Sequence, residues 1–322
     1  MTEALAWLAG GLCVAVLAFV LATWIKGMLK RRRVLATYPP LGQFLTIDGH
    51  RVHYLQFGAG PDLVILHGAT TQMREAMETY APDLGRDFRV TIIDRPGMGY
   101  SDRLSREGES LKQQAAHLDR VLEALGIERT TLLGQSFGGS IALAWVLSRP
   151  ARIEALALTA TPTYRWIPRM PWRIKGPAMP YVGPLIAQFV FVWFPESYYA
   201  RKYREHFFPA AEPEDYTTRI GTPLSVLPGS IVSDNRQLAR MEDDLTELAP
   251  HYSEISVPVE IVNGAEDMIV APDLHAIPLG REIPGARVKL LKGLGHMPHV
   301  GDPDGINGAV RRAARRARTK AG

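Results

Sequence analysis

The sequence has almost no cysteine, since Cys13 is the only one among 322 residues. An intrachain disulfide is therefore excluded, and so is a metal site built from several cysteines. We also find no internal repeat and no low-complexity domain. Apolar residues make up 46% of the chain and charged residues 22%, which are globular proportions with enough apolar material for an ordinary core. One large α/β domain or two small domains would fit this length.

Dense positive charge is missing from the middle of the chain, although the net charge is +4. Basic residues gather instead at 30–33 and again at 311–320. The second cluster can form a basic helix that touches anionic lipid, or an ordinary solvated terminal helix. We expect no nucleic-acid partner from this distribution.

Charge of either sign is absent from residues 4–25, which are apolar throughout. As a helix these 22 residues would be about 33 Å long, enough to cross the hydrocarbon core of a bilayer. Trp7 and Trp24 stand near the two ends, where indole rings favour the membrane interface. A signal peptide and a buried core helix are the alternatives. We interpret residues 1–33 as a transmembrane anchor with a basic flank, which places the catalytic part in the cytoplasm.

The rest of the chain alternates short apolar runs with helical segments, as in a mostly parallel sheet covered by helices on both faces. An amphipathic helix is expected over 111–125. Residues 34–161 and 236–322 form the two parts of this predicted α/β core, the second ending in the basic tail. The predicted strands are 44–47, 51–57, 63–66, 89–93, 130–133, 153–158, 257–262 and 288–291.

Residues 162–235 break this rhythm and are predicted to form a helical lid. Prolines recur through the segment, which leaves little room for a central strand. The same segment carries 14 aromatic residues with basic residues between them. Such a mixture suits a surface facing anionic lipid headgroups, and it also suits an ordinary solvated surface over a self-packed lid.

One stretch organises the predicted chemistry, the sequence Gly134-Gln135-Ser136-Phe137-Gly138. It lies between an apolar strand and an apolar helix. Glycines at 134 and 138 let the two backbones approach closely, and Ser136 is left on a strained turn with its hydroxyl exposed at the helix N-terminus. This G-x-S-x-G pattern is typical of a nucleophile elbow. A Gly/Ser turn that only packs a helix on a sheet is the alternative.

A serine hydroxyl needs a base to remove its proton at neutral pH. His296 is the best candidate, because it follows the last predicted strand and so lies at the same carboxyl edge of the sheet as Ser136. His299 is close in sequence but belongs to the start of the next helix. His67 ends a strand and is expected to hold its own loop by hydrogen bonding.

The histidine needs an anion that fixes its tautomer and stabilises its charged form. Asp267 follows the strand 257–262 and is our candidate, with the adjacent Glu266 as the alternative. Two backbone donors should stabilise the oxyanion of an acyl-transfer reaction. We assign these to the N–H groups of Phe137 and Ala69, with Gly68 allowing the close approach of the second.

Together these motifs resemble the α/β-hydrolase family, over about residues 44–310. The matching segments are His67-Gly68, Asp94-x-Pro96-Gly97-x-Gly99-x-Ser101, Gly134-x-Ser136-x-Gly138-Gly139, Gly264-x-x-Asp267 and Gly295-His296-x-Pro298.

The resemblance implies an α/β-hydrolase fold with Ser136, Asp267 and His296 as a catalytic triad, and an architectural role for Asp94. Gln135 departs from the histidine frequent at that position, which leaves the subgroup and the substrate open. An anchor combined with an aromatic lid resembles membrane-bound monoacylglycerol lipases.

The expected activity is therefore that of a serine hydrolase acting on a carboxylic ester, with a lipid-like acyl ester such as a monoacylglycerol as the substrate class. Acyl transfer to Ser136 needs no cofactor and no metal, and we expect neither. C–C bond hydrolysis and a haloperoxidase-like or perhydrolase reaction use the same triad and stay open. A non-catalytic binding scaffold is the remaining alternative.

Overall fold

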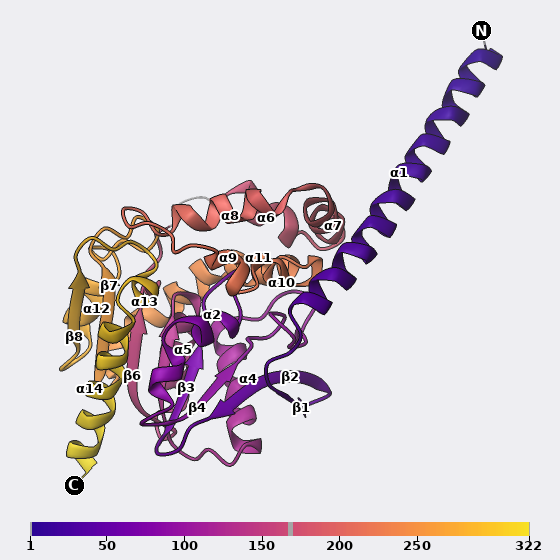
Figure 1. The fold of residues 1–322 in the computed structure, drawn as a ribbon. Coiled ribbons are helices and arrows are strands. Elements are labelled where there is room, and N and C mark those ends of the chain that lie inside the picture. The colour runs from indigo at the N-terminus through magenta and orange to yellow at the C-terminus, as the bar shows by residue number, and fades with distance from the viewer. Residues whose placement is uncertain (1, 167–169, 322) are drawn as a thin grey trace.

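An eight-stranded twisted sheet forms the centre of the protein (Figure 1). The computed structural model describes residues 2–166 and 170–321. The strand order is β1-β2-β4-β3-β5-β6-β7-β8; β1 pairs antiparallel with β2 and β2 with β4, and the other neighbours are parallel. The strands are β1 (Gln43–Ile47), β2 (His50–Phe57), β3 (Asp62–Leu66), β4 (Arg89–Ile93), β5 (Thr130–Gln135), β6 (Ile153–Thr159), β7 (Val259–Gly264) and β8 (Arg287–Leu291). All eight predicted strands are present, so the predicted mostly parallel sheet is confirmed.

Helices cover both faces of the sheet, which explains why the central strands read as continuous apolar runs. One face packs against α4 (Leu111–Ala124), α5 (Phe137–Ser148), α12 (Ala276–Glu282) and the carboxyl half of α11 (Pro228–Leu248), together with the short helix η1 (Ala249–Glu254). The other face packs against α2 (Arg74–Thr79), α3 (Ala81–Leu84) and α14 (Pro303–Ala321). The short α13 (Pro298–Gly301) precedes α14.

A layer of helices lies over the carboxyl ends of the parallel strands, where a lid was predicted (Figure 1). Residues 167–169 of the predicted lid lie outside the described residues. Residue 235 falls inside α11, a helix whose carboxyl half packs on the sheet. The layer consists of α6 (Trp172–Ala178), α7 (Gly183–Trp193), α8 (Glu196–Glu205), α9 (Tyr216–Arg219), α10 (Thr222–Ser225) and the first half of α11.

The N-terminal helix α1 (Thr2–Thr37) projects far from the rest of the protein (Figure 1). By length and composition it could cross a membrane, and its most apolar window makes no contacts that bury it. Its carboxyl end behaves differently. Val34 is 3% exposed and packs in one cluster with Phe191 and Val192 of α7 and with Leu224 of α10. The end of α1 is therefore part of the folded protein.

Candidate active site

The turn between β5 and α5 holds Ser136 in strained backbone geometry, with φ 48° and ψ −121°. This conformation is costly for a residue with a side chain. A Cβ at Gly134 would clash with the backbone of Gly139, and a Cβ at Gly138 would clash with the carbonyl oxygen of Leu66. Both glycines are therefore required by the close approach of strand and helix, and the turn has the geometry of the predicted nucleophile elbow.

The structure brings the three predicted catalytic side chains together, although 131 residues separate the first from the second. Ser136 Oγ lies 3.1 Å from His296 Nε2, and His296 Nδ1 lies 2.8 Å from Asp267 Oδ2. Each residue follows a different strand, β5, β7 or β8, at its carboxyl end. With Nδ1–H donated to the carboxylate, Nε2 is free to accept the serine proton, which is the arrangement a general base requires.

Asp267 is held as a buried anion. Its Oδ1 accepts hydrogen bonds from the backbone N–H groups of Ile269 (2.8 Å) and Val270 (2.9 Å). Burial by itself raises the pKa of Asp267, but the charge and hydrogen bond of His296, with the two backbone donors, bring that pKa below its usual value. The carboxylate is therefore available to orient the histidine at neutral pH.

The alternatives considered from the sequence lie elsewhere. Glu266 is exposed, and its carboxylate accepts from the N–H of Gly293. His299 is buried in α13 near Glu75, with 3.7 Å between its Nε2 and Glu75 Oε1. His67 Nδ1–H donates to its neighbour's carbonyl, Gly68 O (2.9 Å), while Nε2 accepts from a backbone N–H, so this ring holds its own loop as expected.

The two N–H groups proposed for the oxyanion lie on adjoining backbone. Phe137 is the first residue of α5, so its N–H is one of the unpaired donors of a helix N-terminus. The loop carrying Ala69 packs against the elbow, because a Cβ on Gly68 would stand 3.2 Å from Ser136 Cβ. Gln135 fixes this approach: its Oε1 accepts from the N–H of Gly68 at 2.9 Å. The oxyanion role of both N–H groups stays a prediction.

A second set of contacts ties the same loop to helix α11. Thr70 has a left-handed φ of 55°, and both its N–H and its hydroxyl donate to Asp234 Oδ2, at 2.8 and 2.9 Å. Arg95, which is completely buried, donates to Gly68 O (2.9 Å) and to Asp234 Oδ1 (3.1 Å). Asp234 is thus a residue of the predicted lid that shapes the loop beside the serine, and no sequence motif pointed to it.

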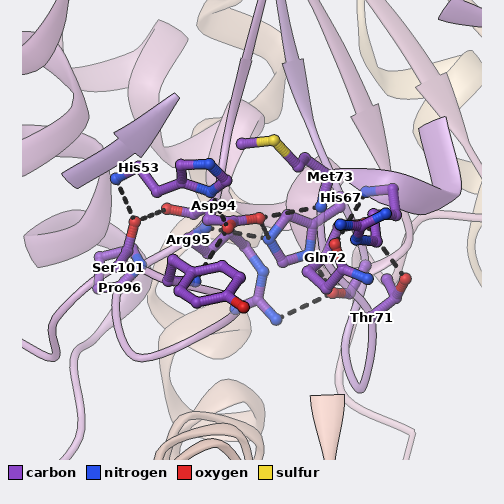
Figure 2. A network of polar contacts seen from close by, with 12 residues as sticks. His53, His67, Thr71, Gln72, Met73, Asp94, Arg95, Pro96 and Ser101 are labelled. Carbon is purple, nitrogen blue, oxygen red and sulfur yellow. Dashed lines mark hydrogen bonds and ion pairs between the residues drawn. The ribbon is translucent and has the colours of Figure 1, made fainter. Parts of the chain in front are cut away.

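Asp94 is the centre of a buried polar network behind this loop (Figure 2). Its carboxylate accepts from the Met73 N–H (2.9 Å) and the Tyr100 N–H (3.0 Å), and it lies 2.7 Å from His53 Nδ1. Ser101 joins the network by donating its hydroxyl to Asp94 O (2.7 Å). Since its oxygens are occupied by structural partners, Asp94 has the architectural role that the family resemblance implied.

Lid residues that follow α8 cover the histidine. The N–H of His296 donates to the carbonyl of His206 at 3.0 Å, and the two imidazole centroids are 5.9 Å apart. Gly295 leaves no room for a Cβ because the carbonyl of Phe208 lies against it. Burial, followed by the proximity of His296, lowers the pKa of His206. Ser136 is 9% exposed and His296 7%, so both catalytic candidates are buried in this conformation.

Within residues 2–166 and 170–321, no group of three His, Cys, Asp or Glu side chains is placed to hold a metal ion. The arrangement instead provides a nucleophile, a base and an orienting carboxylate, which is sufficient for acyl transfer.

Known proteins share the fold described above. A family model described as the alpha/beta hydrolase fold matches residues 61–303. An uncharacterised protein of Mycobacterium tuberculosis is 26% identical over 292 residues, covering 84% of this chain and 80% of that protein. A 2-hydroxy-6-oxononadienedioate/2-hydroxy-6-oxononatrienedioate hydrolase of Paraburkholderia phymatum is 38% identical over 115 residues, covering 34% of this chain and 39% of the relative.

Solved structures show the same fold at low sequence identity. A meta-cleavage product hydrolase matches with a TM-score of 0.69 at 21% identity, covering 86% of this chain and 99% of the other. An esterase from Thermogutta terrifontis matches with a TM-score of 0.65 at 22% identity and the same coverage. The family match spans well over half of the chain and includes all three residues of the Ser136–His296–Asp267 arrangement. The chain therefore belongs to the alpha/beta hydrolase fold family.

Proposed function

We propose that this hydrolase cleaves a carboxylic ester through an acyl-enzyme on Ser136. The observation that carries the proposal is the hydrogen-bonded series from Ser136 Oγ to His296 Nε2 and from His296 Nδ1 to Asp267 Oδ2, built on a strained elbow. His296 removes the serine proton as Oγ attacks the ester carbonyl, and then gives that proton to the departing alcohol. Water, activated by the same histidine, releases the acid.

The oxyanion of each tetrahedral intermediate is assigned to the N–H groups of Phe137 and Ala69. Donors fixed by the fold stabilise the developing charge without reorganising during the reaction. Gln135 and Asp234 hold the loop that carries Ala69, through Gly68 N–H and Thr70. The loop is thus shaped before a substrate arrives.

The proposed substrate class is a neutral lipid-like ester such as a monoacylglycerol. Helix α1 supports this class, because an enzyme held at a membrane meets lipid esters at high local concentration. We assign α1 as a retained single-pass anchor rather than a cleaved signal, since its end packs into the lid through Val34. The basic residues 30–33 follow the apolar run, so the catalytic domain is assigned to the cytoplasmic side.

A C–C bond hydrolase is the second candidate, and the relatives named for that activity favour it. Their names denote carboxylate substrates, and a buried carboxylate needs a cationic partner. Among the described residues, Arg95 contacts the oxyanion loop, and its two terminal guanidinium nitrogens are already bound by Asp234, Gln237 and the Gly68 carbonyl. A neutral ester therefore suits the surroundings of the loop better than an anionic diketone.

The test is covalent labelling followed by a substrate panel. A fluorophosphonate should label the full chain at Ser136, and Ser136→Ala should abolish labelling. Turnover of monoacylglycerols, short p-nitrophenyl esters and vinylogous diketones would then be compared. Preferential cleavage of the diketones would select the second candidate, and labelling that persists in Ser136→Ala would contradict the assignment of the nucleophile.

A further inference from the structure

Lid helix α7 is apolar on two faces, only one of which is buried. Ala187, Phe191 and Val192 are buried inside the lid. The opposite face carries Leu185, 71% exposed, and Phe189, 45% exposed. At 11 residues the helix is about 16 Å long, too short to cross a bilayer. An exposed apolar face of this kind marks a surface that another apolar phase covers.

The exposed face of α7 continues onto α1. The rings of Phe19 and Trp193 are stacked with centroids 5.5 Å apart, and Phe19 lies 6.5 Å from Phe189. Trp193 Nε1 also donates to Thr23 Oγ1 at 3.2 Å. Figure 1 shows α7 beside the part of α1 where that helix leaves the protein. The lid and the proposed anchor thus present one continuous apolar surface.

Cations mark the edge of this surface. Lys26 Nζ lies 4.1 Å from the ring centroid of Trp193, and Lys30 Nζ donates to Phe191 O at 2.6 Å. Both belong to a groove of about 740 Å³ between α1 and the lid, which Arg33 also lines. Of the lining residues that the structure describes, Glu196 is the one carboxylate, against three cations. Tryptophan beside lysine and arginine is the composition found at the level of lipid headgroups.

We propose that α7 lies in the membrane interface beside α1, and that the groove binds the phosphate of an anionic phospholipid. The inference rests on the anchor role proposed above for α1. Phe19 precedes Ile25, the end of the apolar run, by about 9 Å of helix, which agrees with the roughly 5–10 Å depth of interfacial helices. A bilayer is chosen over a second copy of the chain because the apolar face is continuous with α1 and ends in a cationic groove.

Depth measurements on the full chain test the α7 contact directly. In a Cys13→Ser background, which has no other cysteine, Leu185→Cys would be labelled with an environment-sensitive fluorophore and reconstituted in phosphatidylcholine–phosphatidylglycerol vesicles. We expect a blue-shifted emission that lipid nitroxides near the headgroup end of the acyl chain quench. Glu128→Cys, exposed on the loop between α4 and β5, is the matched control and should stay unquenched.

Labelling the native Cys13 separates failure of this inference from failure of the anchor assignment. Quenching at Cys13 without quenching at Leu185→Cys would overturn the α7 contact while leaving the anchor in place. A blue shift at Leu185→Cys that depends on protein concentration, without quenching by lipid nitroxides, would assign the exposed face of α7 to a second copy of the chain. That result would also overturn the proposed membrane contact. Because no readout uses catalysis, an inactive protein that is quenched at both sites would refute only the proposed function.

Native mass spectrometry of the full chain released from mixed vesicles tests the groove. We expect selective retention of phosphatidylglycerol over phosphatidylcholine, lost in a Lys26→Gln/Arg33→Gln double variant. Arg149→Gln, an exposed change far from the groove, should keep the selectivity. Equal retention of the two lipids, or displacement of phosphatidylglycerol by inorganic phosphate alone, would overturn the assignment of the groove to a lipid headgroup.

Discussion

The substitution Asp267→Asn gives the sharpest test of the active-site geometry, since it removes a charge and almost no volume. The asparagine oxygen can accept the two hydrogen bonds that Oδ1 of Asp267 accepts from the N–H groups of Ile269 and Val270. Its amide nitrogen then faces His296, where Oδ2 stands 2.8 Å from Nδ1. Two donors cannot share this contact, so His296 is driven to the tautomer with its proton on Nε2. That nitrogen can no longer accept the proton of Ser136.

The size of the effect follows from the loss of the base. In a triad of this geometry, an aspartate-to-asparagine change lowers kcat about 10⁴-fold. At about 1.4 kcal/mol for each factor of ten, this loss is equivalent to about 5 kcal/mol of transition-state stabilisation. The effect should fall on kcat, because Asp267 is buried behind the histidine and does not face the substrate.

The assay compares the rate of fluorophosphonate labelling and the kcat for a short p-nitrophenyl ester, with thermal unfolding as a check on folding. The matched control is Glu266→Gln, the same chemical change one residue earlier. Glu266 is exposed and accepts only from the Gly293 N–H among the contacts seen, so near-normal activity is expected. A folded Asp267→Asn protein that keeps its activity, or a severe loss in Glu266→Gln, would refute the reasoning.

Three further outcomes are expected. In chemical denaturation, the free energy of unfolding of Ser136→Gly should be about 1–2 kcal/mol higher than that of Ser136→Ala, because a φ of 48° strains any residue with a Cβ. Equal free energies of unfolding would remove the strain argument. Asp234→Asn should lower kcat for the ester about tenfold or more, with KM little changed, because its amide NH2 would face a donor, either the Thr70 N–H or the Arg95 guanidinium. An unchanged kcat would separate the loop from catalysis. Burial and the nearby Arg95 lower the pKa of His67 to about 4. Between about pH 6.5 and 4 the unfolded chain therefore binds a proton that the folded chain does not. The free energy of unfolding should fall by about 3 kcal/mol as the pH is lowered through that window. The pH dependence of unfolding in His67→Gln should be flatter by a similar amount, and parallel curves would contradict this account.

Much of the fold could be predicted because its signals are local. Short apolar runs alternating with helical segments identified all eight strands, and two glycines beside Ser136 identified the elbow. Parallel strands place their following loops at one edge of the sheet. This rule alone was enough to expect that Ser136, Asp267 and His296 would meet, before any distance was known.

Contacts across long stretches of sequence could not be predicted in the same way. The bond between Thr70 and Asp234 joins residues 164 apart, and neither residue belongs to a recognisable motif. The approach of His206 to His296 likewise depends on how the lid lies over the sheet. The lid boundaries and the oxyanion roles remain predictions, because neither rests on a contact that the structure measures.

The sequence by itself determined where strands and helices follow one another along the chain, the turn that exposes a serine, and an apolar helix ahead of a basic run. Each of these depends on residues close together in the chain. Tertiary structure decided which of the two adjacent carboxylates contacts His296, since the folded turn points Asp267 inward and leaves Glu266 exposed. It also decided that α7 lies against α1, because stacking of Trp193 on Phe19 requires the whole lid to be in place. Local patterns record the preferences of neighbouring residues, whereas the partners of a side chain are set by packing across the whole protein.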